Sequence, residues 1–487
     1  AINKLLGDIP YLNGGLFLKH QIEELHGRHI EISDKAFEKL FEFFDIYHWH
    51  LDERLLKKDN EINPDVLGYI FEKYINQKQM GAYYTQEDIT GSISKNTIIP
   101  FIFDAVRKNC GAAFEGDNSI WKLLKNDPDR YIYDAVRLGV IDDRGNVITE
   151  SILPDYVQKG MHDPKARMFD RRYNLGGADL HDHNGMELTL PTETWREYVD
   201  RRNRCLELRN KLVNGEVSNI NDFITYNLNI LQFAQDVIEN CEEPELLRAF
   251  WRVIEQLKAL DPTCGSGAFI FAVLNILELL YEACLQRMQI FLDELERTGE
   301  KHRADKYADF KKILKQVAEH PNPKYFIFKS IIVNNLFGVD IMEEAVEICK
   351  LRLFLKLVAQ IDSAERIEPL PDIDFNIRAG NTLVGFATYD EVKLAVTSKL
   401  DFENNMGRIE EQAEEVDRLF KLFHQQQTAL GGEVTPEDKQ ELRKRLKILE
   451  DELNQYLARE YGIDTNNKTA YKKWLASHKP FHWFIEF

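Results

Sequence analysis

The sequence predicts an α/β fold in which helical regions enlarge a partial parallel sheet. Two short apolar segments, residues 257–261 and 336–340, each end in an aspartate and precede a helical pattern. A glycine-rich turn separates the first segment from its helix, and residues 375–384 form a third apolar segment. Strand, glycine turn and buried helix in this order are typical of parallel sheets.

The chain has 487 residues, of which 44% are apolar, so we expect several structural units with sizeable cores. No run of about 18 apolar residues lacks charge, and the start has no signal-peptide pattern, so we expect a cytoplasmic protein without a membrane segment. The six cysteines lie far apart without a Cys-x-x-Cys pair, which predicts neither disulfides nor zinc. The formal net charge of −19 opposes nucleic-acid binding, which needs clustered Lys and Arg.

Residues 1–110 are expected to form a large helical N-terminal region. Aromatic and aliphatic side chains at three- and four-residue spacings predict an amphipathic helix over 36–58, and a second helix over 66–75. A short β-prone piece at 80–84 comes next. The following Thr-Gln-Glu-Asp resembles a capping box and would place Thr85 at a helix N-terminus.

The rest of the chain is expected to contain four further parts. Residues 111–250 read as a mostly helical insertion, with a loop-like run at 176–185 and long helices over 192–212. Residues 251–400 form the predicted α/β core, with a buried helix over 268–280 and another over 343–357. Residues 401–480 suggest an arm of two antiparallel helices around Gly431-Gly432, and residues 481–487 look like the start of a truncated strand.

The turn at residues 261–267 reads Asp-Pro-Thr-Cys-Gly-Ser-Gly. Its glycines bring the backbone close to a ligand, and the next helix offers free N–H groups to a carboxylate. Asp261, at the strand end, can accept a hydrogen bond from a ligand ammonium or hydroxyl. A plain βα turn is the alternative interpretation, because glycines are common there.

Asp340 ends the next strand, where an acidic side chain can accept both hydroxyls of a ribose. The alternative role is a helix N-cap, because acidic residues follow. Asp340 lies much further from Asp261 than the roughly 20 residues of a simple dinucleotide fold. Helices are therefore inserted between the two strands, and NAD or FAD binding is disfavoured.

With these motifs the chain resembles the adenine-N6 methylase portion of combined restriction-modification enzymes of the Eco57I type. Residues 261–269 look like that family's first motif, and Gly-Ala-Tyr-Tyr-Thr at 81–85 resembles motif ten. Residues 337–341 and 380–384 are similar to motifs two and three. The resemblance covers essentially the whole chain and implies a Rossmann-like methyltransferase core that uses S-adenosylmethionine.

The resemblance also implies residue roles. The Thr85 hydroxyl would contact the cofactor carboxylate, Asp340 would hold the ribose, and Asn381 would contact the adenine. The expected cofactor-binding residues are Tyr84, Thr85, Asp261, Thr263, Gly265, Gly267, Asp340, Ile341 and Asn381.

Amino-methylating enzymes of this class use an (Asn/Asp/Ser)-Pro-Pro-(Tyr/Phe) loop, which the sequence does not contain. The nearest tetrapeptide, Asn-Pro-Lys-Tyr at 322–325, is predicted to be a turn before a strand. No catalytic residue is assigned. We expect a fragment that is inactive alone and whose enzyme contacts double-stranded DNA mainly through other parts, which accounts for the acidic charge.

Two other functions are compatible with the motifs. The chain could be a non-catalytic, cofactor-binding or specificity-associated subunit of a split methyltransferase. It could also be a metabolite-binding Rossmann protein, which would prefer a dinucleotide. A nuclease site is not expected, because Glu-Asp-Lys at 437–439 reads as a helix start. No metal site is expected either, since the paired histidines at 48 and 50, and at 181 and 183, lack a third ligand, and Cys264 is expected to be a packing residue.

Overall fold

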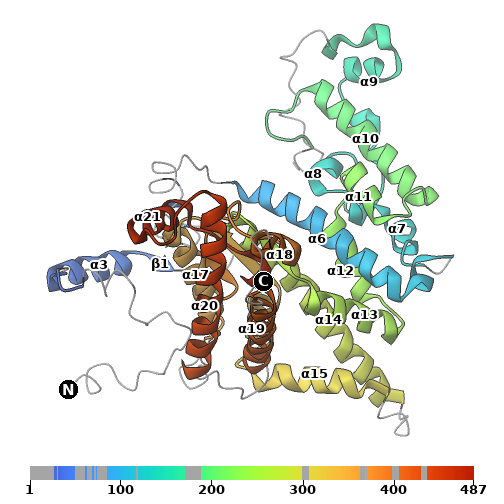
Figure 1. Cartoon of the computed structure of the whole chain (residues 1–487). Coiled ribbons are helices and arrows are strands. Elements are labelled where there is room, and N and C mark those ends of the chain that lie inside the picture. Colours follow the sequence, from blue (N-terminus) through green and yellow to red (C-terminus); the bar gives the residue numbers. More distant parts are fainter. Residues whose placement is uncertain are drawn as a thin grey trace. The chain divides into compact units, whose positions relative to one another are not determined.

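The computed structural model describes residues 27–29, 31–49, 61–62, 68–70, 73, 85–116, 119–170, 188–298, 306–361, 368, 370–397, 405–428 and 436–486. The chain forms two units. Unit 1 contains Ala1–Ser94, Glu255–Glu282 and Leu292–Phe487, and unit 2 contains Lys95–Ile254 and Ala283–Phe291. Figure 1 shows the elements in chain order.

Unit 2 is built from helices in its described part, and the predicted insertion over 111–250 falls within it. Its long α10 begins with a capping box between Thr194 and Glu197, close to the predicted start. The loop-like run 176–185 lies outside the described residues. The elements from α6 to α13 are α6 Glu87–Asn109, η2 Gly111–Phe114, α7 Lys122–Asn126, η3 Pro128–Tyr131, α8 Asp134–Arg137, η4 Glu150–Ile152, α9 Asp155–His162, η5 Pro164–Ala166, η6 Met168–Asp170, α10 Trp195–Asn214, α11 Ile220–Tyr226, α12 Ile230–Glu239 and α13 Pro244–Gln256.

Aromatic side chains fill the core of unit 2. Phe233 lies with its ring centroid 4.6 Å from that of Phe223 and 5.8 Å from that of Phe103. The buried Asp236 accepts hydrogen bonds from the Arg130 guanidinium and the Tyr131 hydroxyl, with Nε–Oδ2 at 2.6 Å. A buried carboxylate is tolerated when it is paired in this way, so this network holds η3 against α12.

The N-terminal part of unit 1 departs from the sequence prediction. Helix α3 (Asp34–Ile46) agrees with the first part of the predicted helix over 36–58, and the prediction is wrong at His48–Trp49. Residues 50–58 lie outside the described residues. Two short parallel strands follow, β1 (His48–Trp49) and β2 (Glu61–Ile62). Aromatic residues such as Trp49 favour extended backbone, and here they do so despite the helical spacing. Most of the predicted helix over 66–75 lies outside the described residues.

The described part of unit 1 contains a parallel sheet in the order β3-β4-β5. Strands β3 (Ala259–Asp261), β4 (Leu336–Asp340) and β5 (Ile377–Ala379) lie where the sequence predicts them. Helices α14 (Ala268–Thr298) and α17 (Glu343–Val358) follow β3 and β4, while α15 (Ala308–Glu319) and α16 (Pro323–Asn334) precede β4. The chain is thus mostly helical with a small α/β sheet, and a complete Rossmann-like core remains a prediction.

Two buried asparagines tie the amino ends of these strands together. The Asn335 amide donates to the Leu257 carbonyl at 2.7 Å and accepts from the Tyr281 hydroxyl at 3.2 Å. The Asn376 amide donates to the Val333 and Leu336 carbonyls, both at 3.0 Å. Buried amides need such partners, and these contacts hold the three strand starts side by side.

Helix α14 packs in the interior. In the described part of the chain it alone is long and apolar enough to cross a membrane by length and composition, and 56% of its apolar stretch is buried inside the protein. Ile270, Leu274 and Leu277 are at most 1% exposed. A core helix of a folded protein has these properties as well.

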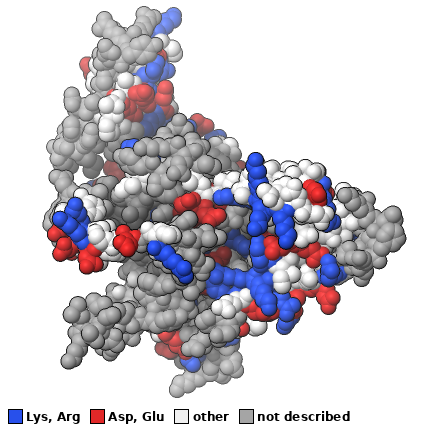
Figure 2. All heavy atoms as spheres, turned by 60° about the vertical axis from the view of Figure 1, so that its left-hand side comes forward, with Lys and Arg blue, Asp and Glu red and all other residues white. Residues whose placement is uncertain are grey.

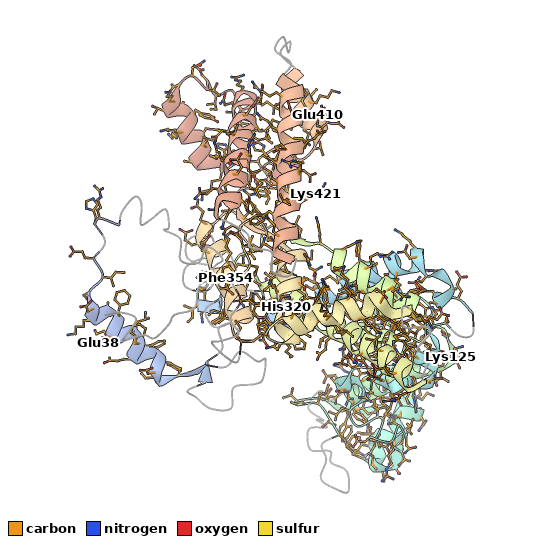
Figure 3. All side chains as sticks on the ribbon, turned by 90° about the horizontal axis from the view of Figure 1, so that it is seen from below. Glu38, Lys125, His320, Phe354, Glu410 and Lys421 are labelled. Carbon is orange, nitrogen blue, oxygen red and sulfur yellow. The ribbon has the colours of Figure 1, made fainter. Side chains whose placement is uncertain are left out.

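The predicted arm is a pair of packed helices, α19 (Asn405–Thr428) and α20 (Pro436–Glu460), preceded by α18 (Tyr389–Thr397). Arg408 near the start of α19 pairs with Glu452 near the end of α20, as antiparallel helices require. Figure 3 shows Glu410 and Lys421 along α19. The glycine pair at 431–432 lies outside the described residues.

Buried ion pairs fasten the base of this arm to the sheet region. Lys439 of α20 pairs with Asp372 and with Asp374, which precede β5. Lys350 of α17 also binds Asp374, at 2.9 Å, and these cations hold the pKa of Asp374 below its usual value against the effect of burial. Asp372 and Asp374 therefore each have a cationic partner.

The last described residues form helices rather than the predicted strand. Helix α21 (Lys468–His478) is followed by a parallel bridge between Asn381 and Pro480, and then by the short α22 (Trp483–Glu486). The Ile485 N–H donates to the His482 carbonyl at 3.0 Å. The prediction of a strand over 481–487 is wrong for this part, because the apolar side chains pack into the arm core in a helical turn.

Candidate functional site

The carboxyl ends of the three strands lie together at one edge of the sheet. Asp261 aligns with Gly338, and Asp340 aligns with Ala379, the residue before Gly380-Asn381. Parallel strands bring their carboxyl ends to the same edge, where ligands bind in open α/β sheets. Asp261, Asp340 and Asn381, which belong to three separate sequence motifs, thus lie at the same edge of the sheet.

The same local turn shapes each of these strand ends. One side-chain oxygen of Asp261, Asp340 and Asn381 accepts the backbone N–H two residues further on, at 3.0, 2.9 and 3.1 Å. This is the Asx turn, which Asp and Asn favour because their short side chains reach that N–H. The Asp261 Oδ2 and the Asn381 Nδ2 form no hydrogen bond with any described residue. Each keeps a polar group for a ligand.

The glycine loop is attached to strand β4. The Gly265 N–H donates to Asp340 Oδ2 at 2.9 Å, and the Cys264 N–H donates to the Val339 carbonyl at 2.9 Å. Gly265 and Gly267 have φ of 53° and 98°, in the region that favours glycine. Asp340 is not the N-cap of α17, since Met342 occupies that position.

Arg352 supports the loop from α17. It is 5% exposed, its Nη1 donates to the Ser266 carbonyl at 2.7 Å, and its guanidinium lies 4.3 Å from the Phe271 ring centroid. A Cβ on Gly68 would lie 2.6 Å from the same Nη1, so the segment at 68–70 covers the guanidinium. Arg352 is absent from the residues predicted from sequence; its signal is an arginine placed between Leu351 and Leu353.

Cys264 and Cys349 lie together beneath the loop. The hydrogen bond with the Cys349 thiol, and then burial, raise the pKa of the Cys264 thiol. A cysteine nucleophile needs a lowered pKa, so this environment keeps the thiol neutral. The geometry agrees with the packing role predicted for Cys264.

The electrostatics of the edge favour a cationic ligand group. Burial raises the pKa of Asp261 above its ordinary value, the Thr263 N–H lowers it, and the nearby Asp340 raises it. Two carboxyl groups at one edge repel each other, and an ammonium or hydroxyl donor between them would relieve that repulsion.

Asn381 is held by the segment that follows α21. Its backbone N–H donates to the Lys479 carbonyl at 2.8 Å, and the Phe481 N–H donates to the Val384 carbonyl at 2.7 Å. A Cβ on Gly380 would lie 2.7 Å from the Phe481 ring, so only glycine permits this approach.

Ile341 and Lys479 border the same edge. Ile341 is 36% exposed, and its carbonyl accepts from the Lys479 ammonium at 3.2 Å. Ile341 is therefore placed beside Asp340 where an apolar contact to a ligand ring is possible. Lys479 was not predicted from sequence, and its position at a helix end gave no specific signal.

The Tyr-Thr pair is only partly described. Tyr84 lies outside the described residues. Thr85 is half-buried two residues before α6, and Gln86 rather than Thr85 accepts the first helical N–H bonds. No hydrogen bond joins Thr85 to Asp340, Asn381 or the glycine loop in the part of the chain that the structure describes.

Two motifs that are not expected to be catalytic have structural roles. Asn322 is the N-cap of α16, and its Oδ1 accepts the Tyr325 N–H at 2.8 Å. The predicted turn before a strand is thus wrong, because Pro323 occupies the first helical position and starts a helix. Helix α20 begins at Pro436, as predicted, and Lys439 is used in the ion pairs of the arm.

Comparison with known proteins shows what the second half of the chain resembles. Residues 334–486 match the family model of the Eco57I restriction-modification methylase. The match contains β4, β5 and the arm, and the glycine loop precedes it.

The chain is also similar to a protein of Methanocaldococcus jannaschii described as a type II restriction enzyme and methyltransferase. The two are 25% identical over 415 residues, which is 82% of this chain and 23% of the relative. The chain thus spans about a quarter of the length of that relative. No solved structure matches the chain.

Proposed function

We propose that this chain is the S-adenosylmethionine-binding part of a site-specific DNA methyltransferase that methylates adenine N6 in double-stranded DNA. Such an enzyme would belong to a type II restriction-modification or related phage-defence system and act in the cytoplasm. The observation that carries the proposal is the carboxyl edge, where Asp261, Asp340 and Asn381 each form an Asx turn. Two of them keep a polar group that no described residue binds. The similarity to restriction-modification methylases supports the same conclusion.

The residues at the edge suit the chemical groups of S-adenosylmethionine. Asp261 Oδ2 can accept from the ammonium group, and the Asp340 oxygens each keep a lone pair for the ribose hydroxyls. Asn381 Nδ2 can donate to an adenine ring nitrogen, and the N-terminus of α14 can face the carboxylate. When bound, the cofactor would supply an electrophilic methyl group. The chain's own contribution would be to bind and orient the donor, because positioning lowers the barrier of a bimolecular transfer.

Calorimetry with S-adenosylmethionine tests the proposal. We expect binding by the wild-type chain, about 10- to 100-fold weaker binding for Asp340→Ala, and about 2- to 10-fold weaker binding for Asn381→Ala. Asp464→Ala is the matched control, because Asp464 forms the same turn with the Asn466 N–H at 3.0 Å in the loop before α21. No binding by the folded wild-type chain, tighter binding of NAD, or equal losses in the control would reject the assignment.

A second function is favoured by one sequence observation, the absence of a Pro-Pro catalytic loop from this chain. The chain could act as a cofactor-binding or specificity-associated subunit that works with a separate catalytic polypeptide. Mixing the chain with a polypeptide that carries such a loop, and measuring methyl incorporation into duplex DNA, distinguishes the cases. Restored methylation supports a split enzyme, whereas cofactor binding without restored methylation supports a non-catalytic module.

A further inference from the structure

Helix α21 is positively charged in an acidic chain. Its sequence, Lys-Thr-Ala-Tyr-Lys-Lys-Trp-Leu-Ala-Ser-His, contains three lysines and no acidic residue, while the whole chain carries a formal net charge of −19. Lys468, Lys472 and Lys473 are all exposed. The nearest carboxylate before the helix, that of Asp464, accepts the backbone N–H of Asn466.

No carboxylate among the described residues neutralises these lysines. Lys468, Lys472 and Lys473 form no ion pair with any residue that the structure describes. On the neighbouring arm, Lys421 pairs with Asp417 at 2.6 Å, and Arg445 pairs with Glu441 at 2.6 Å. These two arm cations are thus engaged within the protein, whereas the lysines of α21 face solvent. Figure 2, in which the side of unit 1 that carries α21 comes forward, shows Lys and Arg side chains on that face, with Asp and Glu side chains among them.

The rest of α21 fixes the direction in which the lysines point. Trp474 is 4% exposed and packs in the arm core, with Tyr471 stacked on it at 6.2 Å between ring centroids. Lys468 and Lys472 are four residues apart, so they lie on one face about 6 Å apart along the helix. The Asn467 side chain caps the helix by accepting the Ala470 N–H at 3.2 Å. The charged face is therefore held outward by a packed helix.

The C-terminal end of α21 meets the candidate site. The Lys479 carbonyl accepts the Asn381 N–H at 2.8 Å, and the Lys479 ammonium donates to the Ile341 carbonyl at 3.2 Å. The helix has 11 residues, so its lysines lie within roughly 16 Å of the carboxyl edge along the helix axis. A duplex whose target base reached that edge would pass its backbone close to α21.

We propose that α21 contacts the backbone phosphates of DNA through Lys468, Lys472 and Lys473. The identity of the partner as DNA rests on the proposed function, whereas the location of the contact rests on the charge, exposure and attachment of the helix. Lysines that contact phosphates position a duplex without reading its sequence. The contact is therefore independent of the target sequence.

Binding of a fluorescent duplex of arbitrary sequence to the full chain, measured from about 25 to 150 mM salt, tests the proposal. Each phosphate contact contributes about 0.9 to the slope of log affinity against log salt concentration. The triple variant Lys468→Gln, Lys472→Gln, Lys473→Gln is expected to lower this slope by about 2 to 3 and to weaken binding at least tenfold at the lowest salt concentration. Thermal unfolding of the variant should match wild type, because the changes are on the surface.

The control is Lys311→Gln, Lys312→Gln, Lys315→Gln, which removes the same charge from exposed positions of α15, a helix that packs against α16. Its slope should equal that of wild type. Equal slopes for both triple variants, or no duplex binding by wild type at the lowest salt concentration, would overturn the proposal. S-adenosylmethionine binding should be unchanged in both triple variants. If the wild-type chain binds no S-adenosylmethionine but the salt slopes of the two triple variants differ as expected, the proposed cofactor is rejected and the proposed DNA contact is retained.

Discussion

The Asp340 carboxylate accepts the backbone N–H of Gly265 across the sheet edge, with 2.9 Å between Oδ2 and N. Its other oxygen accepts the Met342 N–H, also at 2.9 Å. One side chain thus fixes both the glycine loop after β3 and the turn before α17. The residue expected from sequence to hold a ribose also shapes the glycine loop.

Asp340→Asn should destabilise the protein without bound ligand. The amide has one oxygen in place of two, so either the Gly265 N–H or the Met342 N–H loses its acceptor. We expect the free energy of unfolding to fall by about 1–3 kcal/mol. Urea unfolding measures this, and Asp464→Asn, an exposed turn of the same type, should change it by less than about 0.5 kcal/mol. Equal stability of Asp340→Asn and wild type would show that the lost hydrogen bond contributes nothing to stability.

Gly267→Ala should be strongly destabilising for two reasons. The backbone φ is 98°, which a residue with a Cβ rarely adopts, and that Cβ would lie 2.7 Å from Cys349 Sγ. Strain and overpacking together predict a loss of about 2–4 kcal/mol. Thermal unfolding of the double variant with Cys349→Ala should recover about 1 kcal/mol, because only the steric clash is relieved. No recovery would mean that the clash is not the cause.

Arg352→Met should loosen the glycine loop. The change keeps an apolar stem but removes the hydrogen bond to the Ser266 carbonyl and the contact with the Phe271 ring. We expect a loss of about 2–4 kcal/mol in the free energy of unfolding and weaker cofactor binding. Arg459→Met, whose guanidinium lies 5.8 Å from the Tyr456 ring centroid on the exposed side of α20, is the control and should lose less than about 1 kcal/mol.

His482 should make stability sensitive to acid. Burial lowers the pKa of His482 from 6.5 to about 4, and its Nδ1 accepts the Phe386 N–H at 3.1 Å. The unfolded chain takes up a proton below its pKa near 6.5, but the folded protein does so only near pH 4. The neutral imidazole therefore favours the folded protein by about 3 kcal/mol above about pH 6.5, and this stabilisation is lost as the pH falls through 4.

Comparing wild type with His482→Gln separates the effect of His482 on stability from the effects of other groups that titrate at low pH. Urea unfolding of both proteins at about pH 7 and about pH 4 should show a difference in stability that shrinks by about 3 kcal/mol at the lower pH. A difference that stays constant with pH would contradict the neutral, buried imidazole.

The strand ends could be predicted from sequence because Asp, Asn and Gly mark them locally. Asp261, Asp340 and Asn381 each follow a short apolar run, and the structure brings all three to one edge. The contacts of Arg352 and Lys479 could not be predicted, since they depend on packing between segments distant in sequence. The predicted helix over 36–58 was right up to Ile46 and wrong at His48–Trp49, because aromatic spacing alone does not separate an amphipathic helix from a short strand.

The buried amides of Asn335 and Asn376 have a consequence for how the sheet selects its pairing. Strands β3 and β5 have only three residues each, too few for apolar alternation to define one alignment. A slipped alignment would leave both amides without partners in an apolar interior, at a cost of about 1–3 kcal/mol each. The candidate ligand-binding side chains of Asp261, Asp340 and Asn381 lie at the opposite ends of the same strands. The two asparagines therefore also disfavour strand alignments in which these three side chains do not lie together.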